Sequence, residues 1–348
     1  MSSSETQKPT STLISVIIPA YNVAEKLPET LDSLASQSAK DDPRFEFIIV
    51  DDGSRDNTLE VAKSYAASDP RFRVIHQENR GCGPARNNGI EAARGTWIGF
   101  LDGDDILMPG TLEKVLKLGE NPKVDWIFGN YVEFTDHRDG APAPKTPDGM
   151  TPRIPELPET GTTMPAFEWM KDSTRRHHWV HYCWIQFARR SWVNERKLRF
   201  PPRNIFHQDV FWTADLAVEN PLMVFSRDIF VAYRVWSASV SNSKKPRVGK
   251  RHGYSYMHII RSLVRMAAKL RPEHPDVADA LIDHCAFETR HFYGILKHRV
   301  APADRKLMAK VWCPEYTPAL FWQGLPKTGS GIWFAIKFGL TLFKYRHC

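Results

Sequence analysis

The amino-acid sequence predicts an α/β protein with a largely parallel sheet. Three observations support this fold class. Short apolar, β-branched runs recur in the N-terminal part of the chain, segments with apolar side chains at helical spacing separate them, and polar residues follow each run. Strands that alternate with helices form right-handed βαβ units, in which helices cover both faces of the sheet.

The elements follow from the hydrophobic pattern in order. Two runs, LISVII and FEFIIV, are apolar at nearly every position, which is typical of strands buried on both faces. Between them, Leu27, Leu31 and Leu34 recur at helical spacing. The expected elements are strand Leu13–Ile18, helix Glu25–Leu34, strand Phe45–Val50, a helix that starts after Asp56 or Asn57, strand Phe72–Ile75, helix Pro84–Ala93 and strand Thr96–Leu101.

Polar groups follow each of these strands. Ligands of a parallel sheet bind beyond the carboxyl ends of its strands. The groups expected at that edge are Pro19 to Asn22, Asp51 with Asp52, His76 to Asn79, and Asp102 to Asp104. Their convergence predicts a binding site.

An acidic cluster follows the fourth strand. Asp102, Asp104 and Asp105 lie within four positions, and carboxylates this close repel one another and raise one another's pKa. A divalent cation compensates for this charge, and carboxylate oxygens suit Mg²⁺ or Mn²⁺. The alternative is a solvated turn in which an aspartate caps the next helix. The convergence with other strand ends favours the metal site.

Glycine-rich phosphate loops are missing from the sequence. The stretch Gly81–Arg86 lacks the last glycine of G-x-G-x-x-G and follows the third strand, and no P-loop pattern occurs. The sequence therefore disfavours a dinucleotide oxidoreductase or a P-loop enzyme. A nucleotide would be held by carboxylates and a metal.

The pattern becomes less regular in the middle of the chain. Asp136–Glu159 is rich in Pro, Gly and Asp and predicts a long surface loop. Arg175–Trp184 is aromatic and basic, and we expect a strand in which His177 and His178 point to opposite faces. Packing and contacts to a polar sugar or phosphate ligand are favoured there over metal binding.

A second notable carboxylate lies further along the chain. The proline-containing stretch Phe200–Trp212 leads to Asp209 at the start of a predicted helix. Asp209 is either a functional carboxylate or a residue that only stabilises the helix N-terminus. A strand at Ile229–Trp236 and helices from Tyr254 onward complete the expected pattern.

Composition and charge limit the classes to which the protein can belong. The 348 residues are 42% hydrophobic and 25% charged, which is ordinary for a globular protein. The net charge of +7 is uneven, because residues 241–348 carry +12 and residues 1–240 carry −5. A basic C-terminal region favours an anionic partner, either a membrane surface or a nucleic acid.

The remaining signals concern compartment and domain boundaries. Five widely spaced cysteines without C-x-x-C disfavour a disulfide framework or zinc site and predict a reducing cytoplasm. Residues 1–12 are polar and lack the apolar core of a signal peptide. We expect a disordered tail over 1–12, a main domain over 13–240 and a basic, mainly helical region over 241–348. Residues 332–346, apolar with three basic side chains, predict either a membrane-interface helix or a helix packed on the domain, and are too short to span a bilayer.

Taken together, five stretches resemble family 2 glycosyltransferases with the A-type (GT-A) fold. They are Pro19–Asn22 with Glu25, Val50–Asp56, Asn79–Gly81, Ala85–Gly89 and Phe100–Asp105. The resemblance covers about Leu13–Leu116, and a looser likeness continues to about residue 245. The Q-x-x-R-W signature of processive synthases is missing, which implies transfer of a single sugar.

The resemblance implies a UDP-sugar donor and a Mn²⁺ or Mg²⁺ cofactor. Asp51 and Asp52 would hold the uracil and ribose, and Asp102 and Asp104 would form the metal-binding D-x-D. The donor-binding positions carried over from the family are Pro19, Ala20, Tyr21, Asn22, Glu25, Asp51, Asp52, Asn79, Gly81, Arg86, Asp102 and Gly103.

The resemblance also implies a catalytic base. The family usually places it in a Glu-Asp pair before a helix, and here the pair reads Gln208–Asp209. Asp209 would accept the proton of the acceptor hydroxyl in an inverting reaction, while the missing glutamate leaves the orientation of the acceptor open.

A narrower likeness points to bacterial lipopolysaccharide-core glucuronosyltransferases. It is carried by Ser173–Arg176, His207–Thr213, and Tyr233 with Ser237–Ser241. It implies a phosphorylated glycan or glycolipid acceptor, such as a core heptose, at the cytoplasmic face of the inner membrane. The acceptor-binding positions would be Arg175, Arg176, His207 and Gln208.

Other functions remain open at this point. Transfer of another sugar in exopolysaccharide, O-antigen or capsule assembly fits the same residues. Nucleotidyl transfer would need basic residues beside the first strand, where Tyr21–Ala24 has none, and a non-catalytic membrane scaffold predicts loss of the D-x-D or the base. A nucleic-acid binder would use Tyr254 and Tyr256 near Arg251 for stacking, but no nucleic-acid partner is expected.

Overall fold

The computed structural model describes residues 13–40, 42–135, 149–203, 205–236, 246–310 and 337–339. The chain divides into two compact units. The first comprises residues up to 164 with 182–204 and 221–237, and the second comprises 165–181, 205–220 and residues from 238. The expectations for the tail over 1–12 and for a helix over 332–346 concern residues outside the described ranges, apart from 337–339. The domain boundary expected at 240/241 stays a prediction.

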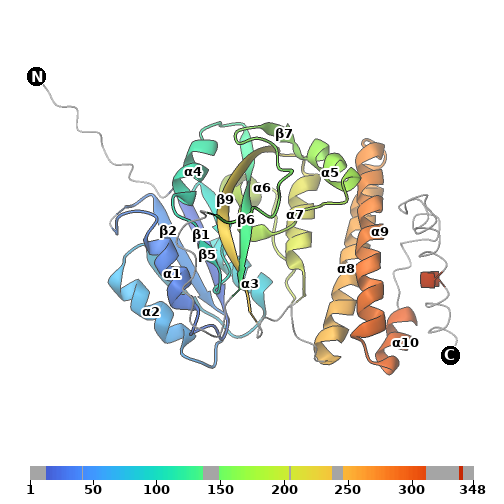
Figure 1. Ribbon diagram of the computed structural model, residues 1–348, viewed down its shortest axis with the longest axis horizontal. Coiled ribbons are helices and arrows are strands. Elements are labelled where there is room, and N and C mark those ends of the chain that lie inside the picture. Colours follow the sequence, from blue (N-terminus) through green and yellow to red (C-terminus); the bar gives the residue numbers. More distant parts are fainter. Residues whose placement is uncertain are drawn as a thin grey trace, which may run out of the picture. The chain divides into compact units, whose positions relative to one another are not determined.

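One mixed sheet organises the first unit. Among the described residues it contains nine strands in the order β3–β2–β1–β4–β8–β6–β9–β5, with β7 paired to β9 (Figure 1). The strands are β1 (Ile14–Ala20), β2 (Phe45–Asp51), β3 (Phe72–His76), β4 (Trp97–Phe100), β5 (Ile106–Leu107), β6 (Val124–Thr135), β7 (Thr163–Pro165), β8 (Gln186–Arg189) and β9 (Leu222–Val235).

The parallel half of the sheet confirms the expected βαβ pattern. β1 pairs in parallel with both β2 and β4, and β2 pairs in parallel with β3. Every residue of β1 and β2 is buried, as their continuous apolar runs predict. The strand order 3-2-1-4 reverses between β1 and β4, which is where an open α/β sheet binds ligands.

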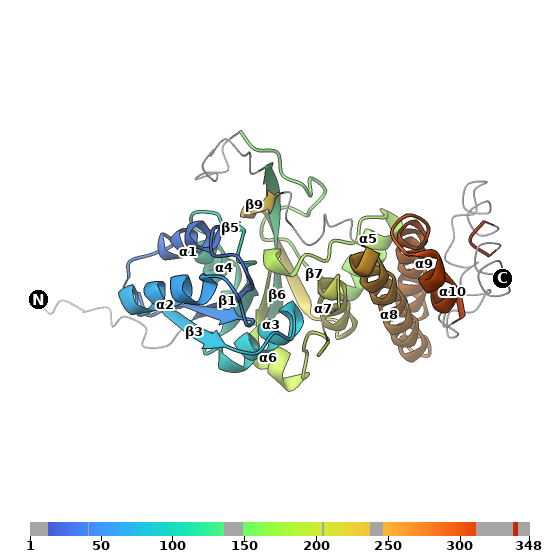
Figure 2. The same ribbon diagram turned by 90° about the horizontal axis from the view of Figure 1, so that it is seen from below.

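Five helices connect the strands within the described residues of this unit. They are α1 (Leu27–Ala35), α2 (Thr58–Ser68), α3 (Cys82–Ala92), α4 (Thr111–Leu118) and α6 (Arg190–Glu195). α1 and α2 lie side by side along the first strands (Figure 2). α3 packs on β1 and β2, and because the crossover from β3 to β4 runs back across the sheet, right-handed connections put α3 on the opposite face.

The other half of the sheet differs from the sequence-based expectation. β8 runs antiparallel to β4 and β6, and β5 runs antiparallel to β9, so the sheet is mixed. β6 was not expected, and β9 begins at Leu222 rather than Ile229. Gly129 inside β6 suggests a strand breaker, but a Cβ there would lie 2.1 Å from the ring of Phe230, so the glycine makes room for that side chain.

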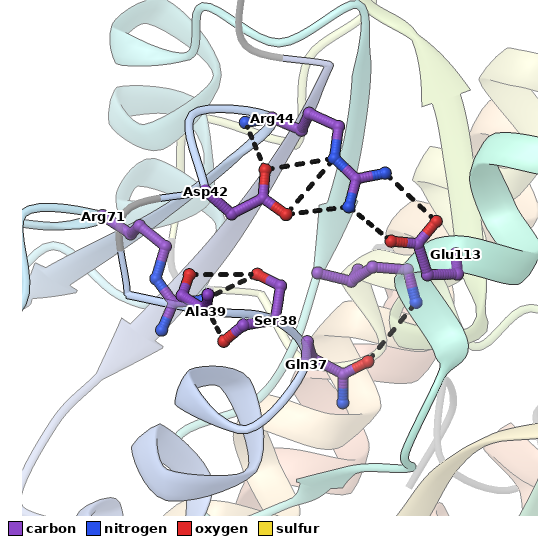
Figure 3. A network of polar contacts seen from close by, with 8 residues as sticks. Gln37, Ser38, Ala39, Asp42, Arg44, Arg71 and Glu113 are labelled. Carbon is purple, nitrogen blue, oxygen red and sulfur yellow. Dashed lines mark hydrogen bonds and ion pairs between the residues drawn. The ribbon is translucent and has the colours of Figure 1, made fainter. Parts of the chain in front are cut away.

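Contacts of two arginines hold the rim of β2 and β3, and Figure 3 shows Arg44 between Asp42 and Glu113 and Arg71 beside Ser38. Arg71 and Asp69 are both almost fully buried, with Nη2 and Oδ2 2.7 Å apart, and Arg71 also donates to the carbonyl oxygens of Ser38 and Ala35. Arg44, which is more exposed, bridges Asp42 and Glu113. These contacts fix the loop between α1 and β2 to the neighbouring elements.

The second unit is helical among its described residues. Its helices are α5 (Ala166–Arg175), α7 (Gln208–Val218), α8 (Pro246–Leu270), α9 (Pro275–His298) and α10 (Pro302–Lys310). The long helices α8 and α9 lie side by side (Figure 1), α5 and α7 pack on them, and α10 contacts α8. No described helix combines the length and the apolar character needed to cross a bilayer.

One local prediction in this region is wrong. The stretch from Arg175 to Trp184 does not form a strand, because α5 continues to Arg175 and a turn follows in which His177 has a φ of 54°. His177 and His178 therefore follow a helix C-terminus. A short 3₁₀ helix, Cys183–Ile185, in the first unit ends the stretch.

Candidate active site

The loop after β4 packs against the carboxyl end of β1. A Cβ on Gly103 would lie 3.2 Å from Val23 Cγ2 and 3.3 Å from the carbonyl oxygen of Pro19, closer than side chains ordinarily pack. Ala20, the last residue of β1, is also buried there, with its Cα 3.7 Å from that position. The small residue at 103 thus brings Asp102 and its neighbours to the end of β1, as the sequence predicted.

Asp52 organises the loop between β3 and α3. Its carboxylate is buried and accepts hydrogen bonds from the backbone N–H groups of Arg80 (2.8 Å) and Gly81 (2.7 Å) and from Gln77 Nε2 (2.7 Å). Its own backbone N–H donates to the carbonyl of Ala20 at 2.9 Å. Three of its four acceptor positions are therefore used within the protein, and one on Oδ2 remains for a ligand.

The residues on either side of Asp52 are also fixed by close contacts. Asp51 is buried, and its Oδ2 lies 2.7 Å from Nδ1 of the exposed His76. Gly53 has a φ of 69°, and a Cβ there would lie 2.8 Å from the backbone nitrogen of Asn79, so glycine is required. The structure thus brings Asp51, Asp52, Asn79 and Gly81 together at the ends of β2 and β3.

Three predicted donor-binding residues lie at the exposed rim after β1. Tyr21 is 43% exposed, and Glu25 pairs with its neighbour Lys26 at 3.3 Å while its side chain stays largely exposed. Asn22 has a φ of 52°, its side-chain oxygen accepts from the backbone N–H of Arg55, and its own backbone N–H donates to Ser54 Oγ. Tyr21 and Glu25 are therefore available to a ligand at this edge.

Arg86 and Asp102 form a close ion pair. The guanidinium of Arg86 is nearly buried on α3, lies over the ring of Phe200 and donates to Asp102 Oδ1 at 2.5 Å. Asp102 keeps partial exposure and a second carboxylate oxygen. The pair places a positive charge beside the acidic cluster.

The end of β9 holds Asp104. Trp236 donates its indole N–H to Asp104 Oδ2 at 2.8 Å, and Arg234 Nε donates to the Asp104 carbonyl at 2.7 Å. Burial, and then the charge of Asp102, raise the pKa of Asp104 from 3.8 to about 6. A positive charge near this carboxylate would stabilise its ionised form and lower its pKa again.

Asp105 has a structural role. It is fully buried, and its Oδ1 accepts the backbone N–H of Arg234 at 2.9 Å. Burial and the charges of Asp104 and Asp102 raise its pKa well above the usual value. Arg234, itself buried, also pairs with Glu29 and lies over Phe134. Asp105 and Arg234 thus tie the acidic loop to the sheet.

The acidic loop fits a divalent metal in its chemistry. Asp102 and Asp104 each retain an oxygen outside the contacts just described, and carboxylate oxygens are the ligands that Mg²⁺ and Mn²⁺ prefer. Burial, followed by the charge of Asp102, raises the pKa of Asp104. Within the described part of the chain, no group of three or more His, Cys, Asp or Glu residues is arranged as a metal cage. Mg²⁺ commonly takes one or two protein carboxylates and completes its shell with water and phosphate.

An aromatic cluster adjoins this loop. Trp184 stacks between Tyr182 (centroids 5.1 Å apart) and Tyr233 (5.5 Å), and Tyr131 meets Trp184 edge-on. The charges of Asp105, Asp102 and Asp104 contribute to the raised pKa of Tyr233, after burial. Tyr182 and Trp184 belong to the aromatic stretch expected to contact a polar ligand, and Tyr233 belongs to the narrower resemblance. Tyr131, Arg234 and Trp236 were not predicted near this loop, although Trp236 stands at the end of a predicted strand.

The second unit contains the predicted base. Asp209 lies in the first turn of α7 and is partly buried, and α7 has no side-chain cap. Among the described residues, its carboxylate makes no hydrogen bond or ion pair. Asp209 therefore does not cap the helix through a hydrogen bond, but its place in the first turn also fits a carboxylate that stabilises the helix N-terminus by its charge, so both readings of Asp209 stay predictions. Gln208, the first residue of α7, is buried.

The other predicted acceptor-binding residues of this unit are also on the surface or near α7. Arg175 and Arg176, at the end of α5, both pair with Asp172 and are 77% and 52% exposed. Exposed ion pairs of this kind contribute little free energy, so both guanidinium groups remain able to contact a phosphate. His207 immediately precedes α7.

The strand order of the first unit and the carboxylates at its strand ends fit the A-type glycosyltransferase fold that the sequence resembles. The chain belongs to glycosyl transferase family 2, whose family model matches residues 15–196. It is 28% identical over 293 residues to the uncharacterized glycosyltransferase YibD of Escherichia coli K12, covering 84% of this chain and 79% of YibD. It is 35% identical over 204 residues to EpsJ of Bacillus subtilis, covering 58% of this chain and about half (54%) of EpsJ.

Two solved structures share the fold. Residues 1–349 of Staphylococcus aureus TarS, in complex with UDP-GlcNAc, match with a TM-score of 0.56 and 17% identity, covering 96% of this chain and 92% of that one. The mannosyltransferase PcManGT of Pyrobaculum calidifontis, in complex with GDP-Man and Mn²⁺, matches with a TM-score of 0.50 and 17% identity, covering 98% and 89%. These similarities confirm the predicted fold class.

Proposed function

We propose that this glycosyltransferase is inverting and metal-dependent, and that it transfers one sugar from a UDP-sugar to a glycan or glycolipid acceptor. The observation that carries the proposal is the packing of Gly103 on the end of β1, which sets Asp102 and Asp104 beside a strand end where sheets of this order bind ligands. The free position on Asp52 and the exposed Tyr21 support a nucleoside site at the same edge. TarS, which shares the fold, was solved with UDP-GlcNAc.

The proposed roles of this chain's residues follow from their chemistry. Asp102 and Asp104 would hold Mg²⁺ or Mn²⁺, and a bound metal supplies Lewis-acid stabilisation of a leaving diphosphate. Arg86 would add positive charge on the same side. Asp209, whose carboxylate has no partner among the described residues, would take the proton of the acceptor hydroxyl as its oxygen attacks the anomeric carbon and the bond to the diphosphate breaks.

We further propose an acceptor at the inner face of the bacterial cytoplasmic membrane. The charge of +12 over residues 241–348 favours attraction to anionic lipid or to a phosphorylated glycan. The exposed guanidinium groups of Arg175 and Arg176 would contact acceptor phosphate. Glucuronate as the sugar and a lipopolysaccharide-core heptose as the acceptor are the finer assignment, carried by the sequence resemblance alone.

The test is a donor-hydrolysis screen on the full chain. UDP-glucose, UDP-galactose, UDP-GlcNAc, UDP-glucuronate and GDP-mannose are each incubated with Mn²⁺, with Mg²⁺ or with EDTA, and release of the nucleoside diphosphate is measured. The proposal predicts metal-dependent release from at least one UDP-sugar and little from GDP-mannose. Release that is unaffected by EDTA contradicts the metal, preference for GDP-mannose contradicts the UDP donor, and release of pyrophosphate from a nucleoside triphosphate and a sugar phosphate would favour nucleotidyl transfer.

A further inference from the structure

The segment that leads into α7 is attached to α8 through several contacts within the second unit. The backbone N–H of Phe206 donates to Ser255 Oγ at 3.0 Å. The ring of Phe206 stacks on His252, with centroids 4.0 Å apart and planes at 14°, and Arg251 lies 4.4 Å from the same ring. His207 Nε2 lies 3.2 Å from His252 Nδ1. Two consecutive residues before α7 are thus fixed to one face of α8.

His207 has an unusual backbone conformation at this point. Its φ of 54° and ψ of 39° are left-handed, which costs free energy for any residue other than glycine. Such a conformation persists where surrounding contacts determine it, and here the imidazole contacts both His252 and Tyr256 (centroids 5.0 Å apart). These contacts determine the direction in which α7 starts, two residues before Asp209.

The two histidines make this contact as neutral groups. Burial lowers the pKa of His207, against the opposing charge of Asp209, and burial together with His207 lowers the pKa of His252 to about 4. In matching tautomers, one neutral ring donates its N–H to the lone pair of the other, so the pair forms one hydrogen bond. If both carried a proton at the contact, the bond would be lost.

We infer that His207 and His252 are positioning residues for sugar transfer, which hold the start of α7 so that the Asp209 carboxylate keeps one orientation toward the acceptor hydroxyl. The inference rests on the proposed role of Asp209 as the base. On this inference, His252 on α8 would affect the rate of transfer without contacting the substrate. Displacing a catalytic group by about 1 Å can lower the rate on the order of 100-fold. Loss of these contacts should therefore slow sugar transfer.

Two substitutions in the full chain test the inference. His252→Phe keeps a flat ring to stack on Phe206 but removes the hydrogen bond. His207→Asn keeps a residue type that tolerates positive φ but is too short to reach His252. Each is expected to lower kcat of transfer by roughly 10- to 100-fold, while the dissociation constant of UDP and the donor KM stay within about twofold, because the donor residues belong to the first unit.

Matched variants separate positioning from a general structural effect. Lys197→Asn places asparagine at another position of positive φ, 55°, and should transfer at the parent rate. The double variant His207→Asn with His252→Phe should be no slower than the slower single variant, since one hydrogen bond joins the pair. His252→Asn, whose amide reaches the place of Nδ1, should retain more kcat than His252→Phe. Melting temperatures show that each variant is folded.

The outcomes decide between this inference and its alternatives. Parent-like kcat in both folded single variants overturns it, as do losses that multiply in the double variant or UDP affinity that falls together with kcat. If Asp209→Asn is slow while the histidine variants are not, only this inference fails. If Asp209→Asn is also as fast as the parent, the proposed function has lost its base.

Discussion

Trp236 donates its indole N–H to the carboxylate of Asp104 at 2.8 Å, across 132 positions of sequence. Together with the bond from Arg234 to the Asp104 carbonyl, it ties the acidic loop after β4 to the end of β9. Asp104 Oδ2 is thereby fixed in direction, and its other oxygen is left for a ligand. These two contacts hold the loop through protein groups alone, which would lower the entropic cost of assembling the proposed metal site.

Removing the Asp104 carboxylate should abolish metal-dependent donor turnover. Asp104→Asn retains an oxygen that can accept from Trp236 but loses the charge that a divalent metal requires. The melting temperature should change little, because this carboxylate makes no stabilising ion pair among the described residues. The measurement is UDP release with and without Mn²⁺. Glu113→Gln, a surface carboxylate paired with Arg44, serves as the control and should behave like the parent. Turnover of the Asp104 variant at the parent rate would remove the acidic loop from the proposed site.

The two arginines of Figure 3 should differ in their contribution to stability. Arg71→Met leaves the almost fully buried Asp69 without its partner, and an unpaired buried charge typically costs about 3–5 kcal/mol. Arg44→Met breaks a more exposed pair and should cost less than about 1 kcal/mol. Urea unfolding of the two variants measures the difference. Equal midpoints would show that burial of the Arg71–Asp69 pair does not govern its energy.

The carboxyl group of Asp215 on α7 predicts that the stability of the protein depends on pH. Burial and the nearby Glu219 raise the pKa of Asp215 from 3.8 to about 7. Between these two values the folded protein retains a proton that the unfolded chain releases, so stability falls as pH rises through that window and stays lower above it. Asp215→Asn removes this loss, and its gain in melting temperature over the parent should be larger at pH 8 than at pH 4. A gain that is constant with pH, or larger at pH 4, would contradict the raised pKa.

The composition of residues 332–346 predicts that this segment attaches the protein to a membrane. If residues 332–346 lie in a membrane interface, their deletion should move the protein from the membrane to the soluble fraction, and salt should weaken the attachment that remains, since charges are screened over about 10 Å at 0.1 M. Fractionation of cell lysates at low and high salt measures this. Recovery of both forms in the membrane to the same extent would leave a helix packed on the domain as the better reading.

Much of the parallel sheet was predictable because burial on both faces leaves a continuous apolar signal. The runs at β1 and β2 show it plainly, and the groups that follow them lie at one edge by the geometry of parallel strands. The other half of the sheet, which mixes parallel and antiparallel pairs, was not predictable in the same way. β8 has only four residues, and Gly129 in β6 resembles a breaker until the ring of Phe230 fills the space beside it.

In the candidate site, too, some residues could be predicted from the sequence and others could not. Asp52, Asp102 and Asp104 could be predicted because each directly follows a recognisable strand. The buried guanidinium of Arg234 could not, since a lone arginine in an apolar strand gives no sign that it will bind a loop 130 positions away. The left-handed conformation of His207 likewise depends on α8, which no local pattern near residue 207 reveals.

The central claim is that Asp209 is the base of an inverting transfer, and Asp209→Asn tests it most directly. A general base contributes roughly 10²–10⁴-fold to rate, and donor binding should not need it. The account predicts that transfer to the acceptor falls by that factor while UDP binds with the parent's affinity and the melting temperature is nearly unchanged. A variant that is folded, binds UDP normally and transfers sugar at the parent rate would contradict it.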